Sequence, residues 1–181
     1  MEQLESAVKR LEEADALDEP AGRLAEVVAA ATRPQVVKDA LSGAWLGHPL
    51  HPALVTGPIG MWTGALLFDL IATRRARWAA DVLVAAGIAS ALPTAASGLS
   101  DWADTTDTKD GARRVGLVHA GCNSLALLCY SASLVARLAG GRKAGVGLSL
   151  AGAAAMGAGS YLGGHMAYVQ GVKVEGRDPG A

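Results

Sequence analysis

The sequence predicts an all-α fold, an integral membrane four-helix bundle that is preceded by short amphipathic helices. Three observations favour this fold. The first 47 residues carry 14 of the 33 charged side chains of the 181-residue chain. Four nearly uncharged segments follow, and each has the length of about 20 residues that is needed to cross a hydrocarbon core of roughly 30 Å. A soluble bundle would carry a charged face on every helix, and these segments have none.

Residues 1–46 are predicted to form an amphipathic helical segment. Apolar residues recur at helical spacing between charged ones: Leu4, Val8, Leu11, Leu17, Leu24, Val27 and Val28. Prolines at 20 and 34 interrupt the pattern, so we expect two short helices and a third after Pro34. The polar face mixes both charge signs, which favours a solvated cap over a helix that binds anionic lipid.

The bundle is expected over residues 47–168, with a polar tail over 169–181. Its four spans are predicted at about residues 52–72, 79–99, 115–138 and 146–168. We expect Gly57-Pro58 and Pro93 to kink the first two spans, because proline lacks a backbone donor. Asp69 and Asp81 are expected to pair with an arginine of the short basic turn between these spans: Arg74, Arg75 or Arg77. Glycine-rich stretches such as residues 145–159 suit close helix contacts in lipid and would permit a homodimer.

Four spans place both termini and the acidic stretch 100–114 on one membrane face, which we call face A, and the two short basic turns on the opposite face B. Six basic residues lie in or beside the turns of face B: Arg74, Arg75, Arg77, Arg137, Arg142 and Lys143. The density of positive charge in short loops predicts that face B is cytoplasmic and face A extracytoplasmic, in a protein of the cell membrane. A formal net charge of −1 without a long basic run argues against a nucleic-acid partner.

All four histidines map to face A. His48 and His51 precede the first span, His119 lies about one turn into the third, and His165 lies about one turn before the fourth ends. Proline follows both His48 and His51 and biases them towards extended geometry, so we expect these two imidazoles on a non-helical segment, with Pro52 as the first helical residue. Ionisable side chains at membrane depth are candidates for function.

Several ligands would suit these imidazoles. A bis-histidine haem would use two of the four. A copper or zinc site would use three or four, with Cys122 as a further ligand because it lies three residues after His119 on the same helical face. Asp101, Asp104 and Asn123 are candidates for orienting a ligating imidazole through its second nitrogen. The alternative is that the histidines are packing residues that hold no cofactor.

Five stretches carry a resemblance to a known family: Gly-His-Pro-Leu-His-Pro (47–52), Pro-Ile-Gly-Met-Trp-Thr (58–63), Ser-Gly-Leu-Ser-Asp-Trp (97–102), Arg-Val-Gly-Leu-Val-His-Ala (114–120) and Tyr-Leu-Gly-Gly-His-Met-Ala-Tyr (161–168). Over about residues 35–173 the chain resembles a bacterial family of four-helix membrane proteins that is classed as a domain of unknown function. It is especially similar to actinobacterial members in which this domain precedes a Rieske-type [2Fe–2S] domain. The resemblance implies an electron-transfer setting. The chain has no Cys-His pairs to hold such a cluster, so we expect a separate Rieske or ferredoxin-like partner or a longer protein of which this is one part.

The sequence therefore predicts a multi-pass membrane protein whose face-A histidines bind haem b and that exchanges electrons with a Rieske-type or other carrier. The preferred ligands are His51, His119 and His165, with His48 as an alternate or supporting ligand. Such a chain is expected to act as an electron-transfer or binding subunit rather than as an enzyme on its own. One alternative is a copper- or zinc-binding membrane protein. The other is a cofactor-free membrane anchor or assembly module.

Overall fold

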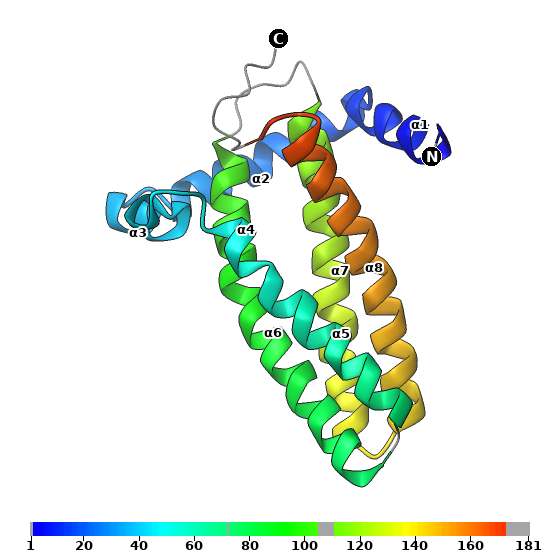
Figure 1. Ribbon diagram of the computed structural model, residues 1–181. Coiled ribbons are helices and arrows are strands. Elements are labelled where there is room, and N and C mark those ends of the chain that lie inside the picture. Colours follow the sequence, from blue (N-terminus) through cyan, green and yellow to red (C-terminus); the bar gives the residue numbers. More distant parts are fainter. Residues whose placement is uncertain (1, 72, 105–110, 173–181) are drawn as a thin grey trace. The chain divides into compact units, whose positions relative to one another are not determined.

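Every regular element of the computed structural model, which describes residues 2–71, 73–104 and 111–172, is a helix (Figure 1). The helices are α1 (Glu2–Glu12), α2 (Asp18–Ala31), α3 (Gln35–Ser42), α4 (His51–Leu54), α5 (Thr56–Ile71), α6 (Arg74–Ala103), α7 (Ala112–Leu138) and α8 (Arg142–Tyr168), with short 3-10 turns at Asp15–Leu17 and Ala44–Leu46. Four segments are long and apolar enough to span a membrane: His51–Ile71, Arg74–Ala103, Ala112–Leu138 and Arg142–Tyr168. The predicted all-α fold with four spans is confirmed.

The chain divides into two compact units. Unit 1 contains the described residues of Met1–His51, Ala96–Gly121 and Gly159–Ala181. Unit 2 contains those of Pro52–Ala95 and Cys122–Ala158. Helices α6, α7 and α8 each contribute residues to both units, and each unit is described below by itself.

The spanning helices are longer than their apolar segments. Helix α6 runs from Arg74 to Ala103, whereas 79–99 was expected, and α7 and α8 begin at Ala112 and Arg142 rather than at 115 and 146. The basic stretch after the first span is therefore largely helical, and the Thr73 hydroxyl accepts the Ala76 N–H at 3.2 Å as a helix cap. Hydropathy marks the apolar part of a helix and not the residue at which its backbone hydrogen bonds end. The predicted span end at residue 72, the loop residues 105–110 and the tail from residue 173 lie outside the described residues.

The first span is interrupted at Val55, between α4 and α5. Pro58 has no N–H with which to bond the carbonyl of Leu54, the residue four positions before it. The Thr94 hydroxyl of α6 donates to this carbonyl at 3.4 Å instead. Pro93 does not interrupt α6, which is continuous from Arg74 to Ala103, and the kink expected at this proline stays a prediction.

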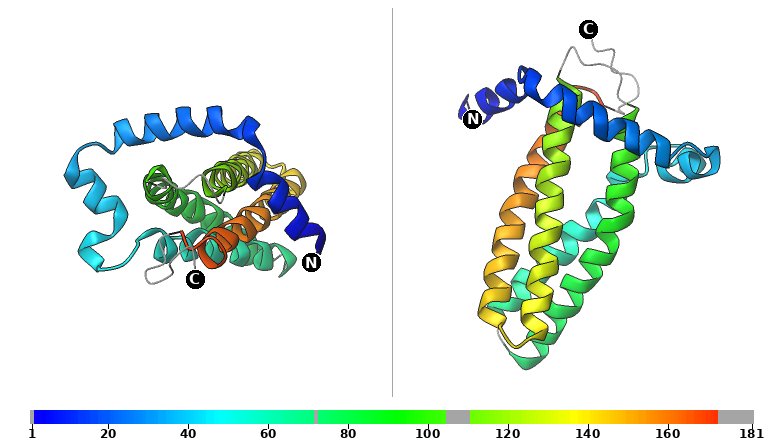
Figure 2. Two further views of the ribbon diagram at one scale, coloured as in Figure 1. Left: turned by 90° about the horizontal axis from the view of Figure 1, so that it is seen from above. Right: turned by 180° about the vertical axis from the view of Figure 1, so that it is seen from behind.

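The N-terminal helices α1, α2 and α3 belong to unit 1, where they run around the ends of α6, α7 and α8 (Figure 2). Three helices were expected, but the break between the first two precedes Pro20, which lies in the first turn of α2. Proline is tolerated there because the first four N–H groups of a helix have no acceptor within it. Ala21 and Ala25 of α2 pack against Trp102 of α6, and the Ser97 hydroxyl donates to the Leu41 carbonyl at 2.7 Å.

Arg114 at the start of α7 joins this N-terminal segment to the spanning helices of unit 1. Its guanidinium donates two hydrogen bonds of 2.7 Å to the Asp18 carboxylate and one of 2.7 Å to the Glu12 carbonyl, and it lies 2.6 Å from Asp15. The hydrogen bond from Arg114 holds the pKa of Asp18 below its usual value.

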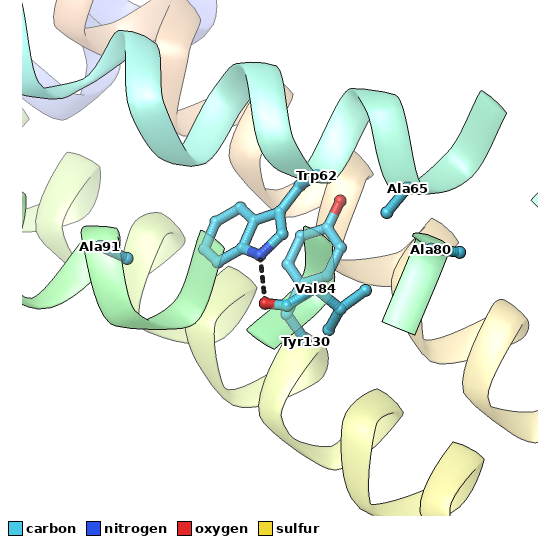
Figure 3. Close-up of a cluster of buried hydrophobic side chains, with 6 residues drawn as sticks. All are labelled: Trp62, Ala65, Ala80, Val84, Ala91 and Tyr130. Carbon is cyan, nitrogen blue, oxygen red and sulfur yellow. Dashed lines mark hydrogen bonds between the residues drawn. The ribbon is translucent and has the colours of Figure 1, made fainter. Parts of the chain in front are cut away.

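The core of unit 2 is built around one aromatic pair (Figure 3). The rings of Trp62 in α5 and Tyr130 in α7 are stacked, with centroids 4.0 Å apart and planes 10° from parallel. The Trp62 indole N–H donates to the Val84 carbonyl of α6 at 3.3 Å. Alanines surround the pair, so α5, α6 and α7 approach closely, as small residues allow in helices that face lipid.

Candidate functional site

All four histidines fall in unit 1. His51 is the first residue of α4, so it is helical, whereas an extended segment with Pro52 as the first helical residue was expected. The difference is one residue and places Pro52 in the first turn, where its missing N–H has no acceptor to lose. His48 lies in the bend that precedes α4.

Two of these histidines, His51 and His119, lie side by side. Their ring centroids are 6.4 Å apart and their planes are 81° apart, which is an edge-to-face arrangement. His51 comes from α4 and His119 from α7, so the pair joins two spans. Their separation in the sequence is 68 residues, and only the fold brings them together.

A backbone hydrogen bond from α8 orients the His119 ring. Its Nδ1–H donates to the Gly159 carbonyl of α8 at 2.7 Å. With the proton on Nδ1, Nε2 is the nitrogen that carries the lone pair. Histidines that bind metals commonly donate their second nitrogen to a carbonyl in this way.

Both rings lie against a glycine of a neighbouring helix. A Cβ atom at Gly98 of α6 would lie 2.6 Å from Cε1 of His51, and one at Gly163 of α8 would lie 3.0 Å from Cε1 of His119. Any larger residue at 98 would displace the His51 imidazole, and one at 163 would press on the His119 imidazole. These two glycines therefore provide the room that the rings occupy.

The other two histidines have different surroundings. The Nε2–H of His165 donates to the Glu12 carboxylate of α1 at 2.9 Å, and the same oxygen accepts the Gln170 side-chain amide at 2.9 Å. His48 is exposed, with its Nδ1 3.1 Å from the Pro49 carbonyl. Glu12 was not among the residues singled out from the sequence, because a glutamate on an amphipathic helix has no distinguishing pattern.

The acidic and polar residues predicted beside the histidines are spread over both units. Asp101 is buried near the end of α6, and Asp104 forms an ion pair with Lys38 of α3, which belongs to the same unit. Cys122 and Asn123 lie on α7 in unit 2. Among residues 2–71, 73–104 and 111–172, no group of three or more His, Cys, Asp or Glu side chains is arranged to hold a metal ion.

Unit 2 contains a charge cluster that differs from the prediction. Asp69 and Asp81 were expected to pair with arginines of the turn at 74–77, and this was wrong. Arg137 of α7 forms ion pairs with Asp69 and with Asp81, the latter at 3.1 Å, and Arg142 of α8 lies 2.6 Å from Asp69 and 3.0 Å from Asp81. The Arg137 side chain is 0% exposed and that of Asp69 4%. One charged residue from each of α5, α6, α7 and α8 thus meets the others.

Serine hydroxyls complete this cluster. The Arg137 guanidinium also donates to Ser133 at 3.0 Å and to Ser149 at 3.1 Å, and both serines are fully buried. The sequence held a signal for this arrangement, since a carboxylate within a span requires an opposite charge at the same depth. Arg137, inside the third predicted span, meets that requirement better than exposed arginines of a turn.

The chain matches the model of a known protein family. A family model described as a predicted membrane protein, DUF2231, matches residues 47–176. This range covers all four spans and all four histidines. No curated protein and no solved structure matches the chain.

Proposed function

We propose that this chain, which belongs to the DUF2231 family of predicted membrane proteins, binds haem b through His51 and His119 and takes part in electron transfer. That the protein crosses the membrane several times follows from the family and from its four apolar helices. The haem and the electron transfer are the proposal. The observation that carries it is the edge-to-face pair of His51 and His119.

The fold brings two imidazoles from different spans to one place, and imidazole nitrogen is a common ligand of haem iron. The centroids are 6.4 Å apart. Two imidazoles are also the number of protein ligands that a haem iron accepts, since the porphyrin supplies the other four nitrogens.

The residues around the pair would orient the imidazoles for ligation. The Gly159 carbonyl accepts the Nδ1–H of His119 and leaves Nε2 as the nitrogen that would bind the haem iron. Gly98 and Gly163 leave room for the two imidazoles. A bound haem would supply a one-electron ferric/ferrous couple. His165 and His48 are alternate ligands only, because His165 is already hydrogen-bonded to Glu12 and His48 is exposed.

The proposed partner is a Rieske-type or other one-electron carrier, and the proposed orientation places the histidines on the extracytoplasmic side. The support for this orientation is the density of basic residues in the two short turns of face B. Labelling of single cysteines introduced at Ser6 and at Lys143 with a membrane-impermeant maleimide in intact cells tests it. Labelling at Ser6 alone is expected, and labelling at Lys143 alone would reverse the orientation.

Absorption spectroscopy tests the haem. The full chain, produced with ample haem and purified in mild detergent, is expected to show a Soret band that shifts on reduction, with about one haem per chain. His51→Ala and His119→Ala should each lose the band, whereas the control variant Gln35→Ala, at an exposed position of α3 in the same unit, should keep it. A wild-type protein that shows no Soret band, even after reconstitution with haem, would overturn the proposal.

The same preparation tests the other occupants. If the protein contains stoichiometric copper or zinc and no haem, and if His51→Ala and His119→Ala lose that metal, the histidine pair is a copper or zinc site instead. If exchange of all four histidines left cofactor content and complex formation unchanged, the membrane-anchor alternative would replace the redox role.

A further inference from the structure

An open groove in unit 2 lies where α5 ends and α6 begins. Its volume is about 760 Å³, and its lining includes Phe68 and Ile71 of α5 and Arg74, Arg75 and Trp78 of α6. The apolar part is unpartnered, because Ile71 is 58% exposed and Trp78 is 70% exposed. The groove thus combines an apolar surface with two guanidinium groups.

The charges of the neighbouring carboxylates are already neutralised. Asp69 and Asp81 are bound by Arg137 and Arg142. Arg74 and Arg75 are exposed, and neither forms an ion pair with another residue of the part of the chain that the structure describes. The positive charge at the groove is therefore available to an outside anion.

Helical spacing places the tryptophan beside both arginines. Trp78 follows Arg74 by four residues and Arg75 by three, so it shares a helix face with each of them. Tryptophan is enriched at the headgroup level of a bilayer, and arginine binds phosphate through two parallel N–H donors. The lining combines the charged side chains of Arg74 and Arg75 with the apolar side chains of Ile71 and Phe68. A phospholipid likewise combines a charged phosphate with apolar acyl chains.

We propose that this groove is a binding site for an anionic phospholipid. Arg74 and Arg75 bind its headgroup phosphate, and Trp78, Ile71 and Phe68 receive the upper part of an acyl chain. The preference for an anionic over a zwitterionic headgroup comes from the two guanidinium groups, which form no ion pair with a carboxylate of residues 2–71, 73–104 and 111–172. This site is separate from the histidine pair and does not depend on a haem.

Native mass spectrometry of the full chain in mild detergent tests the proposal. Dioleoylphosphatidylglycerol is expected to bind with a lower Kd than dioleoylphosphatidylcholine. The variant Arg74→Gln/Arg75→Gln should lose most of this preference, with a loss of about fivefold for each arginine. The control Arg10→Gln/Arg33→Gln removes two exposed arginines of α1 and of the link before α3, and it should keep the preference.

Two further measurements separate the parts of the site. Trp78→Ala is expected to raise the Kd of both lipids several-fold and to leave the ratio of the two Kd values unchanged. Inorganic phosphate at millimolar concentration should not displace the lipid; displacement would show a site for free phosphate and overturn the lipid assignment. If the double variant does not fold, as judged by its elution and circular dichroism, the single variants Arg74→Gln and Arg75→Gln replace it. An unchanged lipid preference in the arginine variants, or an equal loss in the control, would also overturn the proposal.

Discussion

Asp69 and Arg137 form an ion pair within the spanning helices, and the Arg137 side chain is completely enclosed. Arg142 and Asp81 complete the group, so two positive and two negative side chains share one polar cluster. A buried charge that loses its partner is far more costly than a pair in which both members are absent. The first prediction follows from this difference.

Asp69→Asn is expected to lower the free energy of unfolding by about 3 kcal/mol, because Arg137 and Arg142 would then share a single carboxylate. Unfolding in mixed detergent, followed by circular dichroism, measures this loss. Asp39→Asn, at an exposed position of α3, is the matched control and should change little. The double variant Asp69→Leu/Arg137→Leu leaves Arg142 with Asp81 and should recover most of the stability. A double variant as unstable as the single one would contradict the explanation.

Gly98→Ala and Gly163→Ala should each destabilise the protein by about 1–3 kcal/mol, since the added Cβ would press on an imidazole ring. The larger effect is expected at Gly98, where the Cβ would lie 2.6 Å from His51, against 3.0 Å from His119 at Gly163. Gly121→Ala is the control, because a Cβ there meets nothing within 4 Å. Thermal unfolding of the three variants ranks their stabilities. An equal loss of stability in Gly121→Ala would show that these helices do not tolerate added side chains in general, and would contradict the explanation.

Trp62→Ala is expected to cost about 3–5 kcal/mol, because it removes a buried indole that is stacked on Tyr130. Trp45→Ala, at a position 68% exposed, is the matched comparison and should be nearly neutral. Near-ultraviolet circular dichroism should lose the signal of the stacked pair in Trp62→Ala alone. Similar melting temperatures for both variants would contradict a stabilising role for the stack.

The contact between Asp18 and Arg114 should make the attachment of the N-terminal segment depend on pH. The pKa of Asp18 is lowered in the folded protein, so its contribution is fully present above the unfolded value of about 3.9 and is lost as the pH falls through the lower folded value. Asp18→Asn should therefore release the segment to limited proteolysis faster than wild type at pH 7. This difference in proteolysis rate should disappear at a pH below the folded-state pKa of Asp18. A protease that is active in acid is used to measure both rates there.

Glu26→Gln is the control for this experiment, since Glu26 is an exposed carboxylate of the same helix, α2. It should be digested at the rate of the wild-type protein at every pH. A rate difference between Asp18→Asn and wild type that persists unchanged in acid would assign the effect to something other than the ionised carboxylate.

Hydropathy was sufficient to predict the four spans, because the bilayer imposes a minimum length and a low charge on any helix that crosses it. It did not predict where the helices end: α6 continues from 79 back to Arg74, because a basic residue can remain in a helix while falling outside its apolar segment. A kink was expected at Gly57-Pro58, and the structure interrupts the helix at Val55, close to the carbonyl of Leu54 that lacks the N–H of Pro58. Capping and the first turn of α2 depend on local hydrogen bonds, which the periodicity of apolar residues does not record.

The candidate site was predictable in part. The count of four spans predicted that the histidines lie at one membrane face, and in the structure all four belong to unit 1. The pairing of His51 with His119, rather than with His165, depends on which helices are neighbours, and a topology of four spans leaves this open. The position of Arg137 inside a predicted span was a signal for its pairing with Asp69, whereas the contribution of Arg142 depends on which helices are neighbours and could not be predicted from spacing.

The formal charges of Asp69, Asp81, Arg137 and Arg142 sum to zero. A transmembrane potential therefore exerts no net force on the intact cluster and can act only on its dipole. Loss of one carboxylate would leave one uncompensated charge, and carrying such a charge across the whole membrane involves about 2.3 kcal/mol of work per 100 mV. The four side chains together thus add no net charge on which the voltage of an energised membrane could act.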